Sequence, residues 1–146
     1  MKNIFNRLVI ASIFTVILIL VPFIIHSETV PKWTVIEVID GDTIVIQHSD
    51  YFYTNPKIRL LGIDTPESWR PKCDNEKLLG LKAKEFVKKT IADVGNIVTL
   101  GKIDKDKYGR ILTTVYVGNK DLSELLIKNG LGIPYFGDAK TNMWCD

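Results

Sequence analysis

The sequence predicts an α+β fold, mainly β, in which five short strands form a small closed barrel and helices pack against it. Three observations lead to this fold class. Short stretches rich in β-branched and aromatic residues recur between turn signals, and apolar residues repeat once, in mid-chain, at helical spacing. About 119 residues follow an apolar leader, which is enough for one compact domain and too few for two.

The first hairpin is the clearest local prediction. Residues 33–39 (WTVIEVI) and 43–47 (TIVIQ) have strand composition, and Asp40-Gly41 between them is a strong turn signal. A third strand is expected over residues 57–63 (KIRLLGI). It should end at Asp64-Thr65-Pro66, because proline disfavours continuation and keeps the preceding residue extended.

From Glu76 the apolar period changes to that of a helix, which should end near residues 93–96. Downstream we expect strands over 97–100, 111–117 and 131–135, a charged turn over 105–109 and a second helix over 122–129. A helix between the third and fourth strands is the arrangement of an OB-fold barrel. Such barrels bind nucleic acids and sugars on one face.

The first 27 residues form a separate segment. Lys2 and Arg7 precede an apolar run over residues 8–25, and this pattern is typical of a cleaved signal peptide or of an uncleaved membrane anchor. Both interpretations stay open. In either case residues 28–146 should lie outside the cytoplasm, extracellular or periplasmic, and either secreted or tethered through residues 8–25.

Overall charge gives little support for nucleic-acid binding. The chain has 19 basic and 17 acidic residues, and Lys2 and Arg7 lie in the acid-free leader, so residues 28–146 are neutral. Bulk electrostatic attraction to a polyanion is therefore weak. Any recognition of phosphate must come from locally placed arginines and a metal.

The chain has two cysteines, Cys73 and Cys145. In an exported protein an even count favours a disulfide, whereas two unpaired thiols are expected if the domain stays in the cytosol. A bridge between Cys73 and Cys145 would close a long loop and stabilise the fold by roughly 4 kcal/mol in the chain-entropy model.

Three charged motifs carry the predicted chemistry: Asp40-Gly41-Asp42-Thr43, RLLGIDTPE at residues 59–67 and DKYGR at residues 106–110. Asp42 stands just after a turn and Asp64 stands where a strand ends, so their side chains can converge at a barrel rim. Two carboxylates, a backbone carbonyl and waters can hold Ca²⁺. The plainer interpretation is that Asp40 and Asp42 only serve the turn.

The other charged residues suit phosphate and water. Arg59 and Arg110 each offer a planar set of donors for phosphate oxygens, and Glu67 can accept a proton from an attacking water. Tyr108 and Tyr135 can stack on a base or touch a phosphate. Solvent-facing, loop or core roles explain each residue singly, while the combination predicts metal-assisted phosphodiester hydrolysis.

In order and spacing, these motifs resemble the staphylococcal nuclease (thermonuclease) family from about Trp33 to Phe136. The resemblance rests on IDGDT at 39–43, RLLGIDTPE at 59–67, Gly80-x-x-Ala83-x-x-Phe86, DKYGR at 106–110 and LIKNGL at 126–131. It implies an OB-fold barrel of the staphylococcal nuclease type. It also implies a Ca²⁺-dependent endonuclease that cuts DNA, RNA or both and leaves 3′-phosphate ends.

The resemblance also assigns roles to residues of this chain. They are Asp42 and Asp64 as metal-binding carboxylates, Thr65 as the backbone carbonyl ligand, Arg59 and Arg110 as catalytic arginines, Glu67 as general base, and Tyr108 near the phosphate. No matched position is missing. The alternative function is a non-catalytic OB-fold module that binds nucleic acid or a protein. No protein partner is implied, and we expect a monomer.

The chain departs from the family in two ways. Its C-terminus is shortened, because residues 137–146 (GDAKTNMWCD) stand where the family continues into a long helix. We hypothesise that a disulfide between Cys73 and Cys145 replaces the anchoring that this helix provides. The second departure is the neutral charge, which contrasts with a typically basic nuclease.

Overall fold

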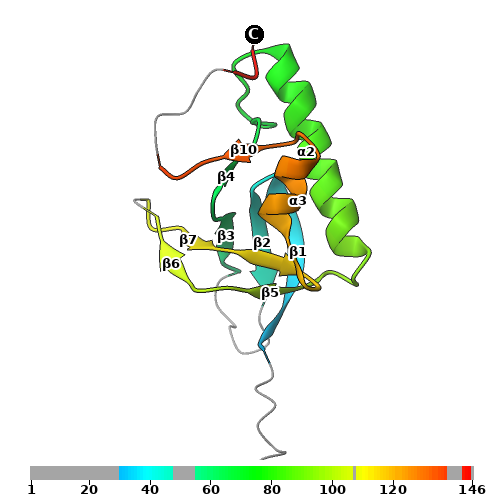
Figure 1. Ribbon diagram of the computed structural model, residues 1–146, viewed down its shortest axis with the longest axis vertical. Coiled ribbons are helices and arrows are strands. Elements are labelled where there is room, and N and C mark those ends of the chain that lie inside the picture. Colours follow the sequence, from blue (N-terminus) through cyan, green and yellow to red (C-terminus); the bar gives the residue numbers. More distant parts are fainter. Residues whose placement is uncertain (1–29, 48–54, 107, 138–142, 146) are drawn as a thin grey trace, which may run out of the picture. The chain divides into compact units, whose positions relative to one another are not determined.

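Strands and two helices make up the part of the chain that the computed structural model describes, which is residues 30–47, 55–106, 108–137 and 143–145 (Figure 1). The leader predicted over residues 1–27 lies outside this part, so its fate stays a prediction. Within the described residues, no helix is both long and apolar enough to cross a membrane.

Most strands of the described residues belong to one sheet with the order β6-β7-β3-β2-β1-β5-β8-β9. They are β1 (Lys32–Asp40), β2 (Thr43–Gln47), β3 (Lys57–Leu60), β5 (Ile97–Leu100), β6 (Asp104–Lys105), β7 (Ile111–Thr113), β8 (Val115–Val117) and β9 (Lys120–Asp121). A second, two-stranded sheet pairs β4 (Ile63–Asp64) with β10 (Ile133–Pro134).

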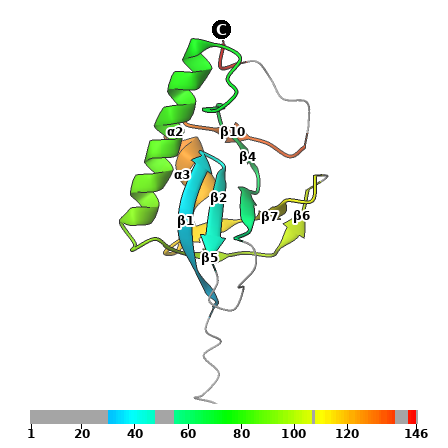
Figure 2. The ribbon, with the colours of Figure 1, turned by 180° about the vertical axis from the view of Figure 1, so that it is seen from behind.

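The strand ladder is open in the described residues, where the sequence predicted a closed barrel. The chain nevertheless links the two halves of this strand order directly. β7 pairs in parallel with β3, β8 pairs antiparallel with β5, and only Thr114 separates β7 from β8. Figures 1 and 2 show β5 and β7 running across the direction of β1 and β2. The predicted class, a mainly β α+β fold of the OB type, is confirmed.

Local backbone geometry explains where the predicted strands break. The strand expected over 57–63 is interrupted at Leu61-Gly62, because Gly62 has a φ of +79°, which ends the extended run. The strand expected over 111–117 is interrupted at Thr114. The two-residue strands β6 and β9 are too short to leave a periodic pattern, and β6 falls where only a charged turn was expected.

The helices lie as predicted, with small shifts at their ends. α2 (Asp74–Ala92) begins before Glu76 because Cys73 is its N-cap, and α3 (Leu122–Lys128) is capped by the Asp121 side chain. α2 runs alongside β1 and contacts α3 (Figure 2). The core between helices and sheet contains Ile44, Ile46, Ile58, Leu60, Ile63, Ala83, Val87, Ile91, Val98, Val115, Leu122 and Leu126.

Candidate active site

Residues from the three charged motifs converge on one cleft of about 770 Å³. Its lining includes Asp42, Arg59, Glu67, Tyr108, Arg110 and Tyr135. These residues come from five places in the chain: the hairpin, β3, the loop after β4, the turn before β7 and the segment after β10. Asp64 and Thr65 are buried beside this lining, with 4% and 2% of their surface exposed. The sequence-predicted residues therefore form one site.

Arg59 is the central buried charge of this site. Its Nη1 lies 2.6 Å from Oδ2 of Asp42, and its Nη2 lies 3.2 Å from Oδ1 of Asp64. The side chains of Arg59, Asp42 and Asp64 are 8%, 11% and 6% exposed. Buried charges require such partners, and removing one member of a buried pair costs several kcal/mol. Strand register sets this contact, because Arg59 in β3 lies opposite Thr43 in β2.

Asp42 also connects the hairpin turn to the end of β4. Its Oδ2 accepts hydrogen bonds from the backbone N–H of Thr65 at 3.1 Å and from the Thr65 hydroxyl at 3.0 Å. Its Oδ1 accepts from the Thr43 hydroxyl at 3.0 Å. These hydrogen bonds and the two contacts of Arg59 thus hold Asp42, Asp64 and Thr65 in one cluster.

The donor chemistry of this cluster fits a hard cation. Carboxylates of Asp42 and Asp64 and the carbonyl of Thr65 are oxygen donors of the kind Ca²⁺ prefers. In the described chain, no group of three or more Asp, Glu, His or Cys side chains is arranged to hold a metal ion. A cation held here would therefore take its remaining ligands from water and substrate oxygens.

Glu67 lines the cleft from a loop whose backbone is firmly placed. The next residue, Ser68, donates from its backbone N–H (3.1 Å) and its hydroxyl (2.5 Å) to Oδ1 of Asp40. On the other side, Gly80 of α2 lies against this loop. A Cβ at Gly80 would lie 2.7 Å from the carbonyl carbon of Glu67 and 2.7 Å from the carbonyl oxygen of Pro66. The helix therefore supports the backbone that carries Glu67.

Arg110 is oriented by Asp106. Oδ2 of Asp106 accepts from Nε of Arg110 at 2.6 Å, and Oδ1 accepts from the backbone N–H groups of Tyr108 and Arg110 at 2.8 and 2.9 Å. Burial alone would raise the pKa of Asp106, but the hydrogen bonds from Arg110 and Tyr108 and the charge of Arg110 outweigh it and lower the pKa. The guanidinium of Arg110 also lies 5.6 Å from the Tyr108 ring centroid.

The sequence motifs assigned no catalytic or binding role to three further charged residues that line the cleft: Asp40, Lys57 and Asp106. Asp106 carried a usable signal, since an aspartate that starts a turn commonly accepts backbone N–H groups two residues on. For Asp40 no sequence signal indicated its hydrogen bond to Ser68, because the two residues are 28 positions apart. Lys57 precedes the apolar part of a strand, where a lysine is most simply solvent-facing.

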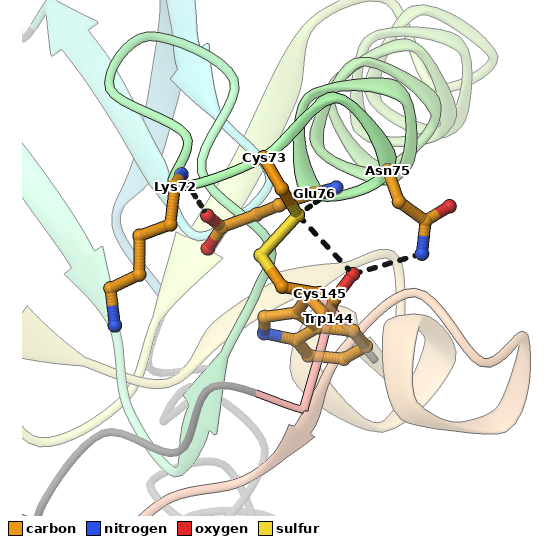
Figure 3. Close-up of a disulfide and its surroundings, with 6 residues drawn as sticks. All are labelled: Lys72, Cys73, Asn75, Glu76, Trp144 and Cys145. Atoms are coloured by element: carbon orange, nitrogen blue, oxygen red, sulfur yellow. Dashed lines mark hydrogen bonds between the residues drawn. A yellow bond between two sulfur atoms is a disulfide. The ribbon is translucent and has the colours of Figure 1, made fainter.

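The disulfide between Cys73 and Cys145 is present, with a Cα–Cα distance of 5.8 Å (Figure 3). It attaches the C-terminal residues to the N-cap of α2. The amide Nδ2 of Asn75 donates to the carbonyl of Trp144 at 2.9 Å, and the backbone N–H of Glu76 donates to Sγ of Cys73 at 3.4 Å. This position agrees with the hypothesis that the bridge anchors the residues around Cys145.

Comparison with known proteins gives related sequences over most of the chain. The profile of a family described as "Staphylococcal nuclease homologue" matches residues 57–144. A thermonuclease from Staphylococcus intermedius is 34% identical over 139 residues, which cover 90% of this chain and 80% of that protein.

Two further relatives align over shorter stretches. A thermonuclease from Staphylococcus hyicus is 34% identical over 99 residues, or 68% of this chain and 56% of that protein, so this chain spans little more than half of that relative. An SPbeta prophage-derived endonuclease from Bacillus subtilis is 36% identical over 94 residues, or 64% of this chain and 30% of that protein.

Proposed function

Because the chain belongs to the staphylococcal nuclease family, we propose that it is a Ca²⁺-dependent endonuclease that hydrolyses phosphodiester bonds of DNA, RNA or both and leaves 3′-phosphate ends. One observation carries this proposal. Asp42, Arg59, Glu67 and Arg110, which come from four separate segments, all line the same cleft. A binding module has no need of this combination of carboxylates, guanidinium groups and a cleft-facing glutamate.

Each residue has a definite task in this proposal. Asp42, Asp64 and the Thr65 carbonyl would hold the cation, which when bound supplies positive charge to the phosphate and to the attacking water. Glu67 accepts a proton from that water as its oxygen bonds to phosphorus. Arg59 and Arg110 donate hydrogen bonds to the phosphate oxygens as negative charge builds up on them. The bond from phosphorus to the 5′ oxygen breaks, which leaves the phosphate on the 3′ side.

The test is a cleavage assay of the oxidised protein on single-stranded DNA, double-stranded DNA and RNA, with Ca²⁺ and with chelator. We expect cleavage only with Ca²⁺ and a loss of roughly 10²–10³ in rate for Arg110→Ala. Arg110 is better suited to this test than Arg59, because its side chain is 41% exposed and not part of a buried ion-pair cluster. Lys102→Ala, an exposed cation that does not line the cleft, is the matched control.

End-group analysis of the products identifies the 3′-phosphate. Failure of the folded, oxidised protein to cut any of the three substrates with Ca²⁺ would reject the nuclease and leave the non-catalytic OB-fold module. Cleavage that continues in chelator would reject the metal requirement alone.

We also propose that residues 28–146 act outside the cytoplasm, either secreted or tethered to the membrane through the leader. The disulfide supports this, since such bridges persist in oxidising compartments and are rare in the cytosol. Cell fractionation and N-terminal sequencing of the protein from the producing cell decide between the forms. Recovery of the full chain in the cytoplasm with reduced cysteines would refute the proposal.

A further inference from the structure

The loop between β4 and α2 exposes an aromatic ring and cations close to the cleft. Trp69 is 78% exposed, and Arg70 and Lys72 are also exposed. An exposed tryptophan invites a functional explanation, because this large apolar side chain is highly buried on average. We propose that residues 68–72, the Trp69 loop, form a second substrate subsite. Trp69 stacks on a base of a single-stranded polynucleotide, and Arg70 binds a neighbouring phosphate.

The Trp69 loop is fixed at both ends. Ser68 is bound to Asp40, as described above, and the backbone N–H of Lys72 donates to Oε2 of Glu76 at 2.5 Å. Directly after Lys72, Cys73 is joined to Cys145 (Figure 3). Only the short segment between these attachments extends into solvent. A loop that is held in this way loses little conformational freedom when a ligand binds, which favours affinity.

The loop is also continuous with the catalytic cleft. Glu67 lines the cleft and precedes Trp69 by two residues, which span at most about 7 Å of chain. Asp40, which holds Ser68, lines the same cleft. A polynucleotide whose reacting phosphate lies beside Glu67 therefore has nearby nucleotides within reach of Trp69. This step rests on the proposed function.

The chemistry of the loop favours a single strand. Every base has a flat face that can stack on an aromatic ring, whereas bases within a duplex already stack on each other. The planar guanidinium of Arg70 matches phosphate oxygens. Because residues 28–146 carry equal numbers of basic and acidic residues, affinity for a polyanion has to come from such local groups. A neutral domain can thus still hold its substrate beyond the reacting phosphate.

The experiment measures binding of labelled oligothymidylates by fluorescence anisotropy, using the full oxidised protein with chelator present to keep the strands intact. The dinucleotide is the probe of the cleft, and the decanucleotide also supplies nucleotides beyond the reacting phosphate for the Trp69 loop. For the decanucleotide we expect Trp69→Leu to raise Kd about 10-fold and Trp69→Phe to change it little, because phenylalanine keeps a ring for stacking. Neither change should alter binding of the dinucleotide.

Arg70→Ala should weaken binding of the decanucleotide and reduce the salt dependence of log K by about 0.7, as expected for one phosphate contact on a single strand. The matched controls are exposed residues of α2 that do not line the cleft, Leu78→Ala for the apolar change and Lys82→Ala for the charge. Both should bind as the unaltered protein does.

The outcomes separate this proposal from the proposed function. A Trp69→Leu protein that binds the decanucleotide as tightly as the unaltered protein overturns the subsite, even if the protein is a nuclease, and leaves the surface to another partner such as a protein. Equal weakening for both lengths also overturns it, because the effect then arises in the cleft. An unaltered protein that neither cuts nor binds any oligonucleotide refutes the proposed function itself.

Discussion

Replacing Gly80 by alanine should impair catalysis from a position outside the cleft. A methyl group at Gly80 would lie 2.7 Å from the Glu67 carbonyl carbon, 2.7 Å from the Pro66 carbonyl oxygen and 2.8 Å from the Ser68 nitrogen. All three are backbone atoms, so no side-chain rotation relieves the overlap. Reaching an ordinary contact of 3.4 Å requires the loop or α2 to move by about 0.7 Å.

The expected magnitudes follow from this displacement. Overpacking lowers the free energy of unfolding by about 1–3 kcal/mol, and the higher helix propensity of alanine offsets up to about 1 kcal/mol of this loss. The net loss in the free energy of unfolding is therefore about 0–3 kcal/mol. Displacing a catalytic group by about 1 Å can reduce the rate by up to 10²-fold. Because the Asp42–Arg59–Asp64 cluster stays in place, we expect kcat to fall about 10- to 100-fold while KM changes little.

The assay combines urea denaturation with steady-state cleavage of a labelled single strand. Leu81→Ala, an exposed position of the same helix that is 44% exposed, is the matched control and should leave both unchanged. If Gly80→Ala folds and cuts at the rate of the unaltered protein, the reasoning is refuted. Contact between α2 and the loop would then have no part in placing Glu67.

The other predictions concern the disulfide and Asp106. Reduction of Cys73–Cys145, or its replacement by two serines, should lower the free energy of unfolding by about 2–4 kcal/mol in urea denaturation, and an unchanged midpoint would rule out the anchoring role. Asp106→Asn should lower the cleavage rate, because Arg110 loses the carboxylate that orients its Nε. Asp104→Asn, at an exposed position, is the control. Equal cleavage rates for the unaltered protein and both variants would contradict this role of Asp106. Since folding depresses the pKa of Asp106, its contribution to stability should be complete above the pKa of the unfolded chain and disappear as pH falls through the lower folded value. NMR titration of the folded protein would show this directly, and a pKa at or above the ordinary aspartate value would exclude it.

Elements specified by neighbouring residues were predictable from the sequence. The first hairpin follows from Asp40-Gly41 between two β-branched stretches, and α2 follows from its apolar spacing. The parallel pairing of β3 with β7 could not be foreseen, because it joins segments about 50 positions apart and depends on how the sheet curves. The break at Gly62 was missed because a glycine in an apolar run does not reveal the sign of its φ.

For the site, the sequence identified the residues but not their relations to one another. Alternation along β3 left open whether Arg59 faces solvent, and the register with β2 decides that it is buried between Asp42 and Asp64. This burial changes what is expected of Arg59. On motif grounds it is a phosphate ligand, whereas in the structure its removal would also leave two buried carboxylates without their counter-charge.

The bridge between Cys73 and Cys145 also determines whether a single proteolytic cut can divide the protein into two pieces. The two cysteines are 72 positions apart, and the chain from Cys73 to Cys145 forms a covalent ring that contains Arg110 and Tyr135, while Asp42, Arg59 and Glu67 precede it. A single cut anywhere inside this ring opens the backbone without releasing a fragment, since both pieces remain joined through sulfur. After a cut inside the ring, a reductant is also needed to separate one wall of the cleft from the other, whereas a cut in residues 68–72, which precede the ring, needs none.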